Sequence, residues 1–421
     1  MTSRAWGLAV MSIGLLSTEA LAAQGTTPCV AVLDHADTGR RMQGGVRQYA
    51  SGDVRAHCDG QETSMASDSI AWLRAQGRFE MVGNARFRDT TVTLDADRAV
   101  YFLDDERLEA YGNVRLVNRA SGTVLTGPNL TYYRSVPALR DTTELYATHR
   151  PTVEYRADGE SADAEPYIIL GDRVRLRGAN LAWASGDVRI DRSDFHAEAD
   201  SAELDLGTDA GELLGRASVT GGGTDGSGYQ LNGREIGFTS VDNALNWVQA
   251  RDSAEAESTE FFIRADTVEF GIADNKIQGG FAWGDVLRPY AVSGTNTIVA
   301  DSIAIDAPNQ QLEELRGFGA ARALSVRDST DDDPDWIAGD TLVARFASTV
   351  LTGRFLEQIV ATGTAAALYR VYREGGGDLP DINYSRGDQI IATFSPFGIM
   401  LVTVHGNADG VHLESIRGNR P

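Results

Sequence analysis

A short phrase recurs along this chain and limits its fold more than any other feature. Each copy opens with Gly, Ala or Ser, continues with a second residue that is usually Asp, and then alternates polar and apolar residues. Strict alternation is the pattern of a β-strand with one buried and one exposed face. Taking the second residue as the anchor, the copies lie at Asp68, Asp97, Pro128, Ala179, Asp200, Arg234, Asp266, Asp301, Asp340 and Asp388.

The residues two and four places after the anchor are apolar or aromatic in every copy. Since neighbouring strand residues point to opposite faces, these side chains are expected to share one inward face, while Thr131 and Glu269 face outward. We call the following residues the inward set: Ile70, Trp72, Ala99, Tyr101, Leu130, Tyr132, Leu181, Trp183, Leu204, Ile236, Phe238, Val268, Phe270, Ile303, Ile305 and Leu342.

The spacing of the copies predicts the unit of the fold. Asp68, Asp97 and Pro128 follow one another at 29 and 31 residues, which fits a strand, a turn and a return strand. The 51-residue gap from Pro128 to Ala179 indicates a degenerate copy near residues 167–174. A single rung of this kind cannot bury its apolar face alone, so we expect an all-β, elongated stack of rungs around a continuous apolar interior.

The first residues predict export from the cytoplasm. Arg4 precedes an apolar stretch from Ala5 to Leu16, and Ala20-Leu21-Ala22 is a small-x-small cleavage site, so residues 1–23 are expected to be a signal peptide. The apolar stretch is too short to span a bilayer as a helix.

The two cysteines fit an oxidising compartment. Cys29 and Cys58 are expected to form one disulfide, outside the repeat core, that pins an N-terminal segment of residues 24–60. The rest of the chain divides into repeat blocks at residues 61–160, at 161–300 and, with more divergence, at 301–421.

Composition argues against several classes of function. The formal net charge of −22 repels nucleic acid, so no nucleic-acid partner is expected. None of the six histidines pairs with a second His or Cys at metal-ligand spacing, and no G-x-S-x-G, H-E-x-x-H or phosphate-loop motif occurs. The acidic run before Pro334 is expected to be a solvated loop rather than a Ca²⁺ site. We therefore expect no enzymatic activity, no metal and no other cofactor.

The phrase and its return strand resemble the OstA-like, or LptA-like, repeat of lipopolysaccharide transport. The order of that repeat, A-D-x-A-x-Y, then G-N-V, then L-x-G-x-x-L-x-Y, is followed by Ala96 to Tyr101, Gly112 to Val114 and Leu125 to Tyr132. The match is best between residues 66 and 135 and looser in the later copies. In the family, this repeat builds a periplasmic bridge protein and the periplasmic domain of the outer-membrane translocon.

The resemblance implies both a fold and a function. The fold would be a β-jellyroll, a sheet folded over on itself with partly open edges, and the inward set would line a groove for the acyl chains of lipopolysaccharide or a related lipid. The location would be periplasmic, at or near the outer membrane. Partners would be other OstA-like proteins, or further copies of this chain, stacked end to end.

The chain departs from the family in two ways. A typical bridge protein is less than half as long, so this chain resembles either a bridge with more rungs or a paralogue with a different role. It is also acidic, and the arginines that could meet lipid phosphates at a groove rim are scattered: Arg74, Arg98, Arg115 and Arg134.

Two other hypotheses remain open at this point. A secreted parallel β-helix, as in adhesins and polysaccharide-active proteins, also has imperfect β repeats, although its coils are shorter and carry stacked Asn ladders. A ligand-free envelope spacer with a filled core would show the same inward face. Sequence alone separates a filled core poorly from an open groove.

Overall fold

The computed structural model is all-β, which confirms the predicted class. The structure describes residues 29–42, 44, 46–136, 139–156, 165–193, 195–222, 228–242, 244–326, 334–349, 353–371, 380–396 and 398–414. The predicted signal peptide and the acidic run before Pro334 lie outside the described residues. Within the described residues the strands form one 28-stranded sheet, and the helical turns are η2 (Arg74–Gln76) and η3 (Pro308–Gln310).

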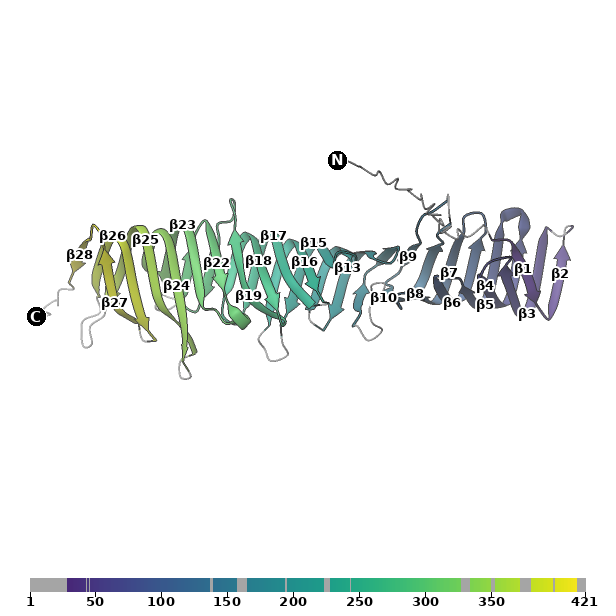
Figure 1. Ribbon diagram of the computed structural model, residues 1–421, viewed down its shortest axis with the longest axis horizontal. Coiled ribbons are helices and arrows are strands. Elements are labelled where there is room, and N and C mark those ends of the chain that lie inside the picture. The colour runs from purple at the N-terminus through teal and green to yellow at the C-terminus, as the bar shows by residue number, and fades with distance from the viewer. Residues whose placement is uncertain are drawn as a thin grey trace, which may run out of the picture.

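The strands lie across the long axis of an extended stack, with β1 and β2 at one end and β28 at the other (Figure 1). The first rungs are β1 (Ala31–His35), β2 (Thr38–Met42), β3 (Arg47–Cys58), β4 (Ser64–Leu73), β5 (Arg78–Arg88), β6 (Val92–Phe102), β7 (Arg107–Asn118) and β8 (Val124–Tyr133). The middle of the stack is built from β9 (Glu144–Thr148), β10 (Thr152–Tyr155), β11 (Tyr167–Leu170), β12 (Arg173–Arg177), β13 (Leu181–Arg192), β14 (Phe195–Asp205), β15 (Ala210–Gly221), β16 (Tyr229–Val241), β17 (Ala244–Ser258) and β18 (Phe262–Ala273). The last rungs are β19 (Lys276–Trp283), β20 (Tyr290–Ser293), β21 (Asn296–Val299), β22 (Ser302–Asp306), β23 (Glu314–Ser325), β24 (Asp335–Thr349), β25 (Gly353–Val371), β26 (Asp381–Ser395), β27 (Gly398–His405) and β28 (Asp409–Leu413).

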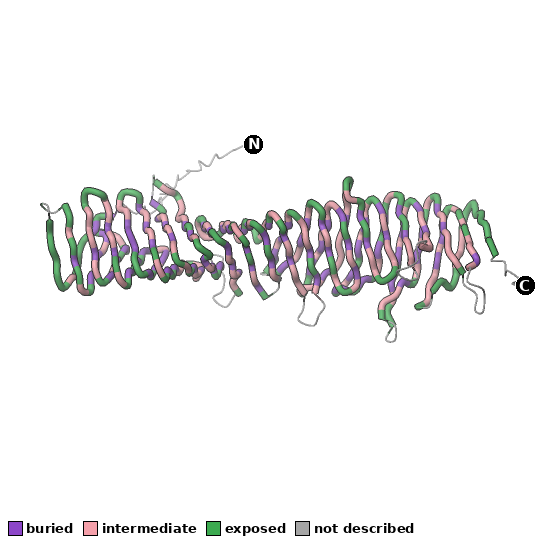
Figure 2. Tube along the Cα trace, turned by 180° about the vertical axis from the view of Figure 1, so that it is seen from behind, coloured by how far each residue is buried: buried purple, intermediate pink, exposed green. Residues whose placement is uncertain are grey.

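Some rungs are interrupted near their middle. β9 and β10 both pair with β8, and β11 and β12 both pair with β13, so each pair is one broken rung. The hydrogen bonds from β8 to β13 close a small ring of six strands, where the stack narrows in Figures 1 and 2. Of the predicted block boundaries, residue 160 lies outside the described residues and residue 300 lies in the broken rung β21–β22. Strand pairing continues on both sides of each of these boundaries.

A bulge bends the rungs, as β7 shows. Gly112 and Asn113 have φ angles of 73° and 45°, and the register with β8 shifts between Tyr111 and Val114. A Cβ on Gly112 would lie 2.3 Å from a carboxylate oxygen of Asp97, so this position needs glycine for its space as well as for its backbone. Asn113 Nδ2 donates to Asp97 Oδ2 at 2.9 Å. A bulge of this kind turns the strand and increases its twist.

The same contact recurs along the sheet and explains the repeated phrase. In each case an aspartate carboxylate lies against a positive-φ glycine of the next rung: Asp37 with Gly52, Asp68 with Gly83, Asp172 with Gly186, Asp200 with Gly215, Asp301 with Gly319, Asp340 with Gly363 and Asp388 with Gly406. The anchor aspartate therefore marks a corner of the sheet. The small residue before it, such as Ser67 or Ala96, is buried on the inner side of that corner.

The corners fold the sheet over on itself. β6 has 11 residues, and an extended strand of that length spans roughly 35 Å. Yet Asp89, before β6, and Glu106, after it, both contact the guanidinium of Arg134, at 3.2 and 2.6 Å. The two ends of the rungs therefore meet. We call the turns after β3, β5 and β7, and those on the same side further on, the first edge; the turns after β4, β6 and β8 lie on the second edge. The line where the edges meet is the seam.

The predicted inward face is wrong at one copy. Leu181 and Trp183 are half-buried and face outward, because their neighbours Ala182 and Ala184 are the buried residues of β13. Ala179 is not an anchor but lies in the turn that precedes a bulge-bearing rung. The true copy is Gly171-Asp172, in the region where the spacing indicated a degenerate one, and it is followed by buried Val174 and Leu176.

Candidate functional site

Most of the inward set lies in one apolar core that runs along the stack, as the buried residues in Figure 2 show. Trp72 is only partly buried; it packs against this core and against the ring of Phe79. The buried members are Ile70, Ala99, Tyr101, Leu130, Tyr132, Leu204, Ile236, Phe238, Val268, Phe270, Ile303, Ile305 and Leu342.

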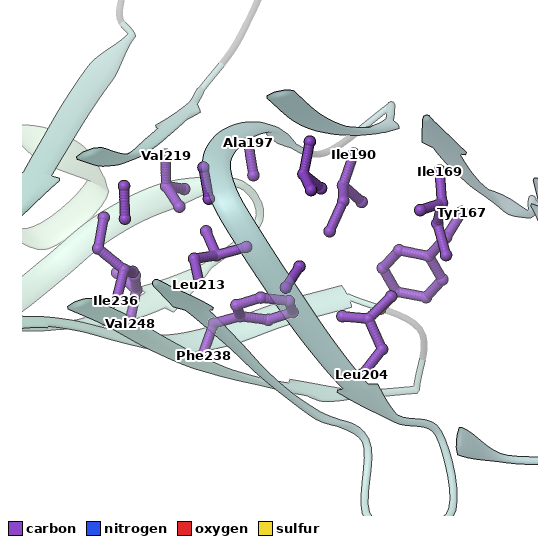
Figure 3. Close-up of a cluster of buried hydrophobic side chains, with 14 of the residues drawn as sticks. Tyr167, Ile169, Ile190, Ala197, Leu204, Leu213, Val219, Ile236, Phe238 and Val248 are labelled. Atoms are coloured by element: carbon purple, nitrogen blue, oxygen red, sulfur yellow. The ribbon is translucent and has the colours of Figure 1, made fainter. Parts of the chain in front are cut away.

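The middle rungs are filled by their own side chains. In Figure 3, Leu204, Leu213 and Phe238 lie together in the interior. A Cβ on Gly211 would lie 2.2 Å from the Phe238 ring and 2.8 Å from Leu204, so there is no space here for even one added methyl group. In this conformation the middle rungs form a packed core rather than an open groove.

Polar contacts close the seam along much of the stack. Each contact joins a residue on the first edge to a residue on the second edge. The partner usually lies in the second or third second-edge turn further along the chain, because the folded sheet is sheared, so that its two edges are offset along the stack. These contacts are Tyr155 Oη to the Ala179 carbonyl at 3.2 Å, Arg192 Nη2 to Ser240 Oγ at 3.5 Å, Gln310 Nε2 to the Gly228 carbonyl at 2.9 Å, and the ion pair of Arg354 with Glu260 at 2.9 Å.

The seam opens toward the C-terminal end. A cavity of about 600 Å³ lies between the first-edge ends of β23 to β25 and the second-edge ends of β25 to β27. Its inner wall is apolar and is lined by Ile337, Leu356, Ile359, Ala367 and Phe394. We call this cavity the C-terminal mouth.

The outer lip of the mouth is an exposed apolar strand. Met400 is 69% exposed and Leu401 is 60% exposed on β27, and Ile399 beside them is also exposed. A run of apolar residues on both faces of an outer strand is unusual, because such strands are normally protected against further pairing. Sequence reasoning missed this site, although the unbroken apolar run from Ile399 to Val402, without alternation, was a signal.

Polar groups stand at the first-edge side of the mouth. Arg370 Nη1 pairs with Asp335 at 3.1 Å, and both residues line the mouth. The guanidinium of Arg322 lies over the Trp336 ring at 4.4 Å on the outer face of the sheet. Burial raises the pKa of Tyr369. A cation at the rim and apolar side chains inside are the arrangement that an anionic amphiphile would need, although Arg370 is paired with Asp335 here.

The scattered arginines do not form a rim. Arg134 is 4% exposed and pairs with Asp89 and Glu106 inside the seam. Arg74 lies over Trp72 at 4.1 Å and Arg98 over Tyr111 at 5.6 Å, while Arg115 is exposed. The only member of the four near the interior is therefore engaged in an internal ion cluster.

The structure joins Cys29 to Cys58 by a disulfide. Its predicted position outside the core is wrong, since Cys58 is fully buried and Cys29 nearly so, both within the core cluster. The reason is that β1 to β3 are rungs of the same sheet, and the bridge lies on its inner side.

The described part of the chain contains no group of three or more His, Cys, Asp or Glu side chains able to hold a metal ion. No helix in that part has the length and hydropathy needed to cross a membrane. Comparison of the sequence with models of known protein families and with curated proteins finds no match to either.

Proposed function

We propose that this protein binds the acyl chains of lipopolysaccharide, or of a related envelope lipid, in the periplasm and shields them during transport to the outer membrane. The observation that carries the proposal is the C-terminal mouth, where the long apolar interior reaches the surface. Its volume of about 600 Å³ lies within the ~300–1,000 Å³ typical of ligand pockets.

Apolar burial alone is large enough for such binding. Each buried methylene contributes about 0.8 kcal/mol, so a 12-carbon chain gains roughly 10 kcal/mol before the entropic cost of association. Polar groups would then be needed mainly to place the head group, and Arg370 lies at the first-edge side of the mouth. No catalytic group is required.

The corner geometry supports the OstA-like interpretation. The family's A-D and G-N motifs are the residues that meet at the bulge of Asp97 with Gly112 and Asn113, and the antiparallel sheet folds over as a jellyroll of that family would. The exposed apolar strand β27 and the neighbouring β28 fit end-to-end stacking with another OstA-like protein or a second copy of this chain.

Of the two alternative hypotheses, the parallel β-helix conflicts with the strand pairing, whereas the ligand-free spacer does not. Every strand pairing in the described residues is antiparallel, so the fold is not a parallel β-helix. A ligand-free spacer is favoured by the tight packing around Gly211 in the middle rungs. The spacer hypothesis predicts that the mouth binds no lipid.

A photoreactive 12-carbon fatty acid with a diazirine in its chain tests the proposal. Irradiation of the purified protein followed by peptide mapping should label residues of the mouth, and excess lipopolysaccharide should suppress the labelling. Labelling that is absent, or that lipopolysaccharide does not reduce, would contradict the proposal.

Two adjacent alanines provide a matched pair of variants. Ala367 faces the cavity, whereas Ala366 faces outward on the same strand. Ala367→Phe should fill the mouth and reduce labelling at least fivefold, and Ala366→Phe should leave it unchanged. Equal labelling of the two variants would place the bound lipid elsewhere.

A further inference from the structure

A run of aromatic and arginine side chains crosses the outer face of the sheet near its second edge, from β8 to β13. The rings of Tyr133 and Tyr146 meet edge to face, with centroids 5.8 Å apart and an angle of 82° between them. The guanidinium of Arg175 lies 5.3 Å from the centre of the Tyr146 ring and 5.0 Å from that of Trp183. The strand register produces this run, because Tyr146, Arg175 and Trp183 are directly opposite one another on β9, β12 and β13.

The aromatic rings remain accessible from outside. Tyr146 is 37% exposed, and Tyr133 and Trp183 are half-buried on the outward side of their strands. A sugar ring has an apolar face that packs on an aromatic ring, and hydroxyl groups at its rim that need polar partners. Exposed rings with polar neighbours are therefore suited to a saccharide.

A small cavity lies beside the two tyrosines. Its volume is about 240 Å³, and it is lined by Thr131, Tyr133, Arg140, Glu144 and Tyr146. This is below the ~300–1,000 Å³ of pockets for drug-sized ligands, so it suits a group of the size of one sugar ring. The two rings supply apolar walls, while the threonine hydroxyl, the carboxylate and the guanidinium supply hydrogen-bonding groups.

Glu144 is ready to accept hydrogen bonds from a ligand. Tyr146 Oη donates to its carboxylate at 2.6 Å, and this bond together with the nearby Arg175 holds the pKa of Glu144 below its usual value. An ionised carboxylate has about four acceptor positions, so these contacts leave capacity for a sugar hydroxyl.

The same surface carries a local excess of positive charge. Arg173, Arg175 and Arg177 alternate along the outward side of β12, and Arg140 lies 4.7 Å from the centre of the Tyr133 ring. Among the described residues, Glu144 is the one carboxylate within ion-pair distance of these arginines, at 3.3 Å from Arg175 and 3.7 Å from Arg177. In a chain with a formal net charge of −22, four arginines around one carboxylate favour an anionic ligand.

Cross-strand pairing alone does not account for this surface. Single pairs of arginine with an aromatic ring stabilise sheets without any ligand, and Arg322 with Trp336 is such a pair elsewhere on the outer face. From β8 to β13 the pairs are continuous, border a cavity and include more cations than carboxylates. We call the surface formed by Tyr133, Tyr146, Trp183, Arg140, Arg175 and Arg177 the outer patch.

We propose that the outer patch binds an acidic saccharide, with one sugar ring in the cavity beside Tyr133 and Tyr146 and the acidic group of a neighbouring sugar on the arginines of β12. The site lies on the outer face of the sheet, so it does not depend on the proposed lipid binding in the interior. Two sources offer this chemistry: the phosphorylated carbohydrate of lipopolysaccharide and a separate acidic polysaccharide.

Calorimetric titration of the purified protein tests the proposal with two probes, hexagalacturonate and the oligosaccharide of lipopolysaccharide freed of its acyl chains. At least one should bind at a single site, and neutral maltohexaose should bind much more weakly. Tighter binding of the lipopolysaccharide oligosaccharide identifies that source, and tighter binding of hexagalacturonate identifies a separate polysaccharide. Binding of neither acidic probe, or equal binding of maltohexaose, overturns the proposal.

A matched pair of tryptophan variants locates the site. Trp183→Ala should weaken binding of the acidic probe roughly tenfold, because it removes an aromatic surface of the patch. Trp247 is also half-buried on the outward side of its strand, β17, but lies away from the patch, so Trp247→Ala should leave the affinity unchanged. An equal effect of the two substitutions overturns the proposal.

A pair of exposed arginines provides the second comparison and covers a loss of folding in Trp183→Ala. Arg173 has no ion-pair partner in the described part of the chain, and Arg173→Gln should weaken binding about threefold. Arg189→Gln removes the same charge from neighbouring β13, where Arg189 pairs with Asp191 at 3.0 Å, and should have no effect. Unchanged affinity in Arg173→Gln, or an equal reduction in both variants, contradicts a site at the outer patch.

Discussion

The N-terminal rungs β3 to β8 and the C-terminal rungs β23 to β28 share one corner motif but differ at the seam. Asp97 with Gly112 and Asp388 with Gly406 make the same contact, at 2.3 and 2.2 Å from the glycine's ideal Cβ position. Arg134, Asp89 and Glu106 form a buried ion cluster that closes the N-terminal seam beside the Cys29–Cys58 disulfide. The C-terminal seam opens into a cavity of about 600 Å³. The repeated phrase therefore determines where each rung bends, but not whether the seam is closed or open.

Shear explains much of this difference. Each first-edge turn meets a second-edge turn that lies further along the chain, as Asp89 meets Arg134 and Glu260 meets Arg354. For the first-edge turn after β25, a second-edge turn two places on would lie past β28, the last described strand. The C-terminal mouth is thus the place where an additional rung, a partner or a ligand would complete the interior.

The largest expected effect is on the closed seam. Arg134→Met should destabilise the protein by about 3–5 kcal/mol, because Asp89 and Glu106 would remain buried without their cation. Urea unfolding measures the change. Arg216→Met is the control, since its side chain is 85% exposed and its loss should leave the midpoint essentially unchanged. Equal midpoints for the two variants would mean that the cluster does not hold the seam.

Packing should also differ between the two regions. Leu108→Ala, in the filled N-terminal interior, should cost about 2–5 kcal/mol, because a fully buried side chain leaves a cavity. Phe394→Ala, at the open mouth, should cost less despite the larger deletion, since its surroundings are already partly empty. Thermal unfolding of both variants makes the comparison. A larger loss for Phe394→Ala would show that the mouth is packed in solution.

Replacing the corner glycine should reduce the stability of the protein by a similar amount at both ends of the stack. Gly112→Ala introduces a Cβ 2.3 Å from the Asp97 carboxylate and should cost about 1–3 kcal/mol more than a neutral change, and Gly406→Ala should behave alike. Gly122→Ala is the matched control, because Gly122 has the same φ of 73° but no atom within 4 Å of the added Cβ. If the control loses as much stability, backbone strain rather than the aspartate contact explains the glycine.

The smallest effect is a pH dependence that should be strongest in the N-terminal seam. Burial raises the pKa of Tyr101 and of Tyr132 above the ordinary value of 10.0, with further increases from Glu106 and Asp89 and opposition from Arg134. A raised pKa in the folded state means that the stability from the neutral phenols is complete below about pH 10 and is lost as the pH rises above it. Limited proteolysis at pH 9 and 11 should show earlier cleavage in the N-terminal rungs. Replacing both tyrosines by Phe should abolish that difference; if it persists, the phenols are not its cause.

Several features of the fold could be predicted from sequence because they are local. Alternation of polar and apolar residues decides which face of a strand is buried, and it was correct for pairs such as Ile236 with Phe238 and Val268 with Phe270. It is wrong at Leu181 and Trp183, because Ala179 is not an anchor and the buried residues of this strand are Ala182, Ala184 and Val188. In this strand both faces begin with apolar side chains, Leu181 and Trp183 on one and Ala182 and Ala184 on the other, and alternation alone does not say which of the two faces is buried.

The sequence by itself determined the rung, the corner and the two cysteines that could bond. These depend on backbone preferences and on contacts between neighbouring strands, which a short phrase contains. Only the tertiary structure decided which turns meet across the seam, that Arg134 lies between Asp89 and Glu106 rather than at a lipid-facing rim, and that the interior opens near Phe394 and Met400. Those outcomes follow from the shear of the folded sheet, which accumulates over many rungs and brings together residues far apart in the chain.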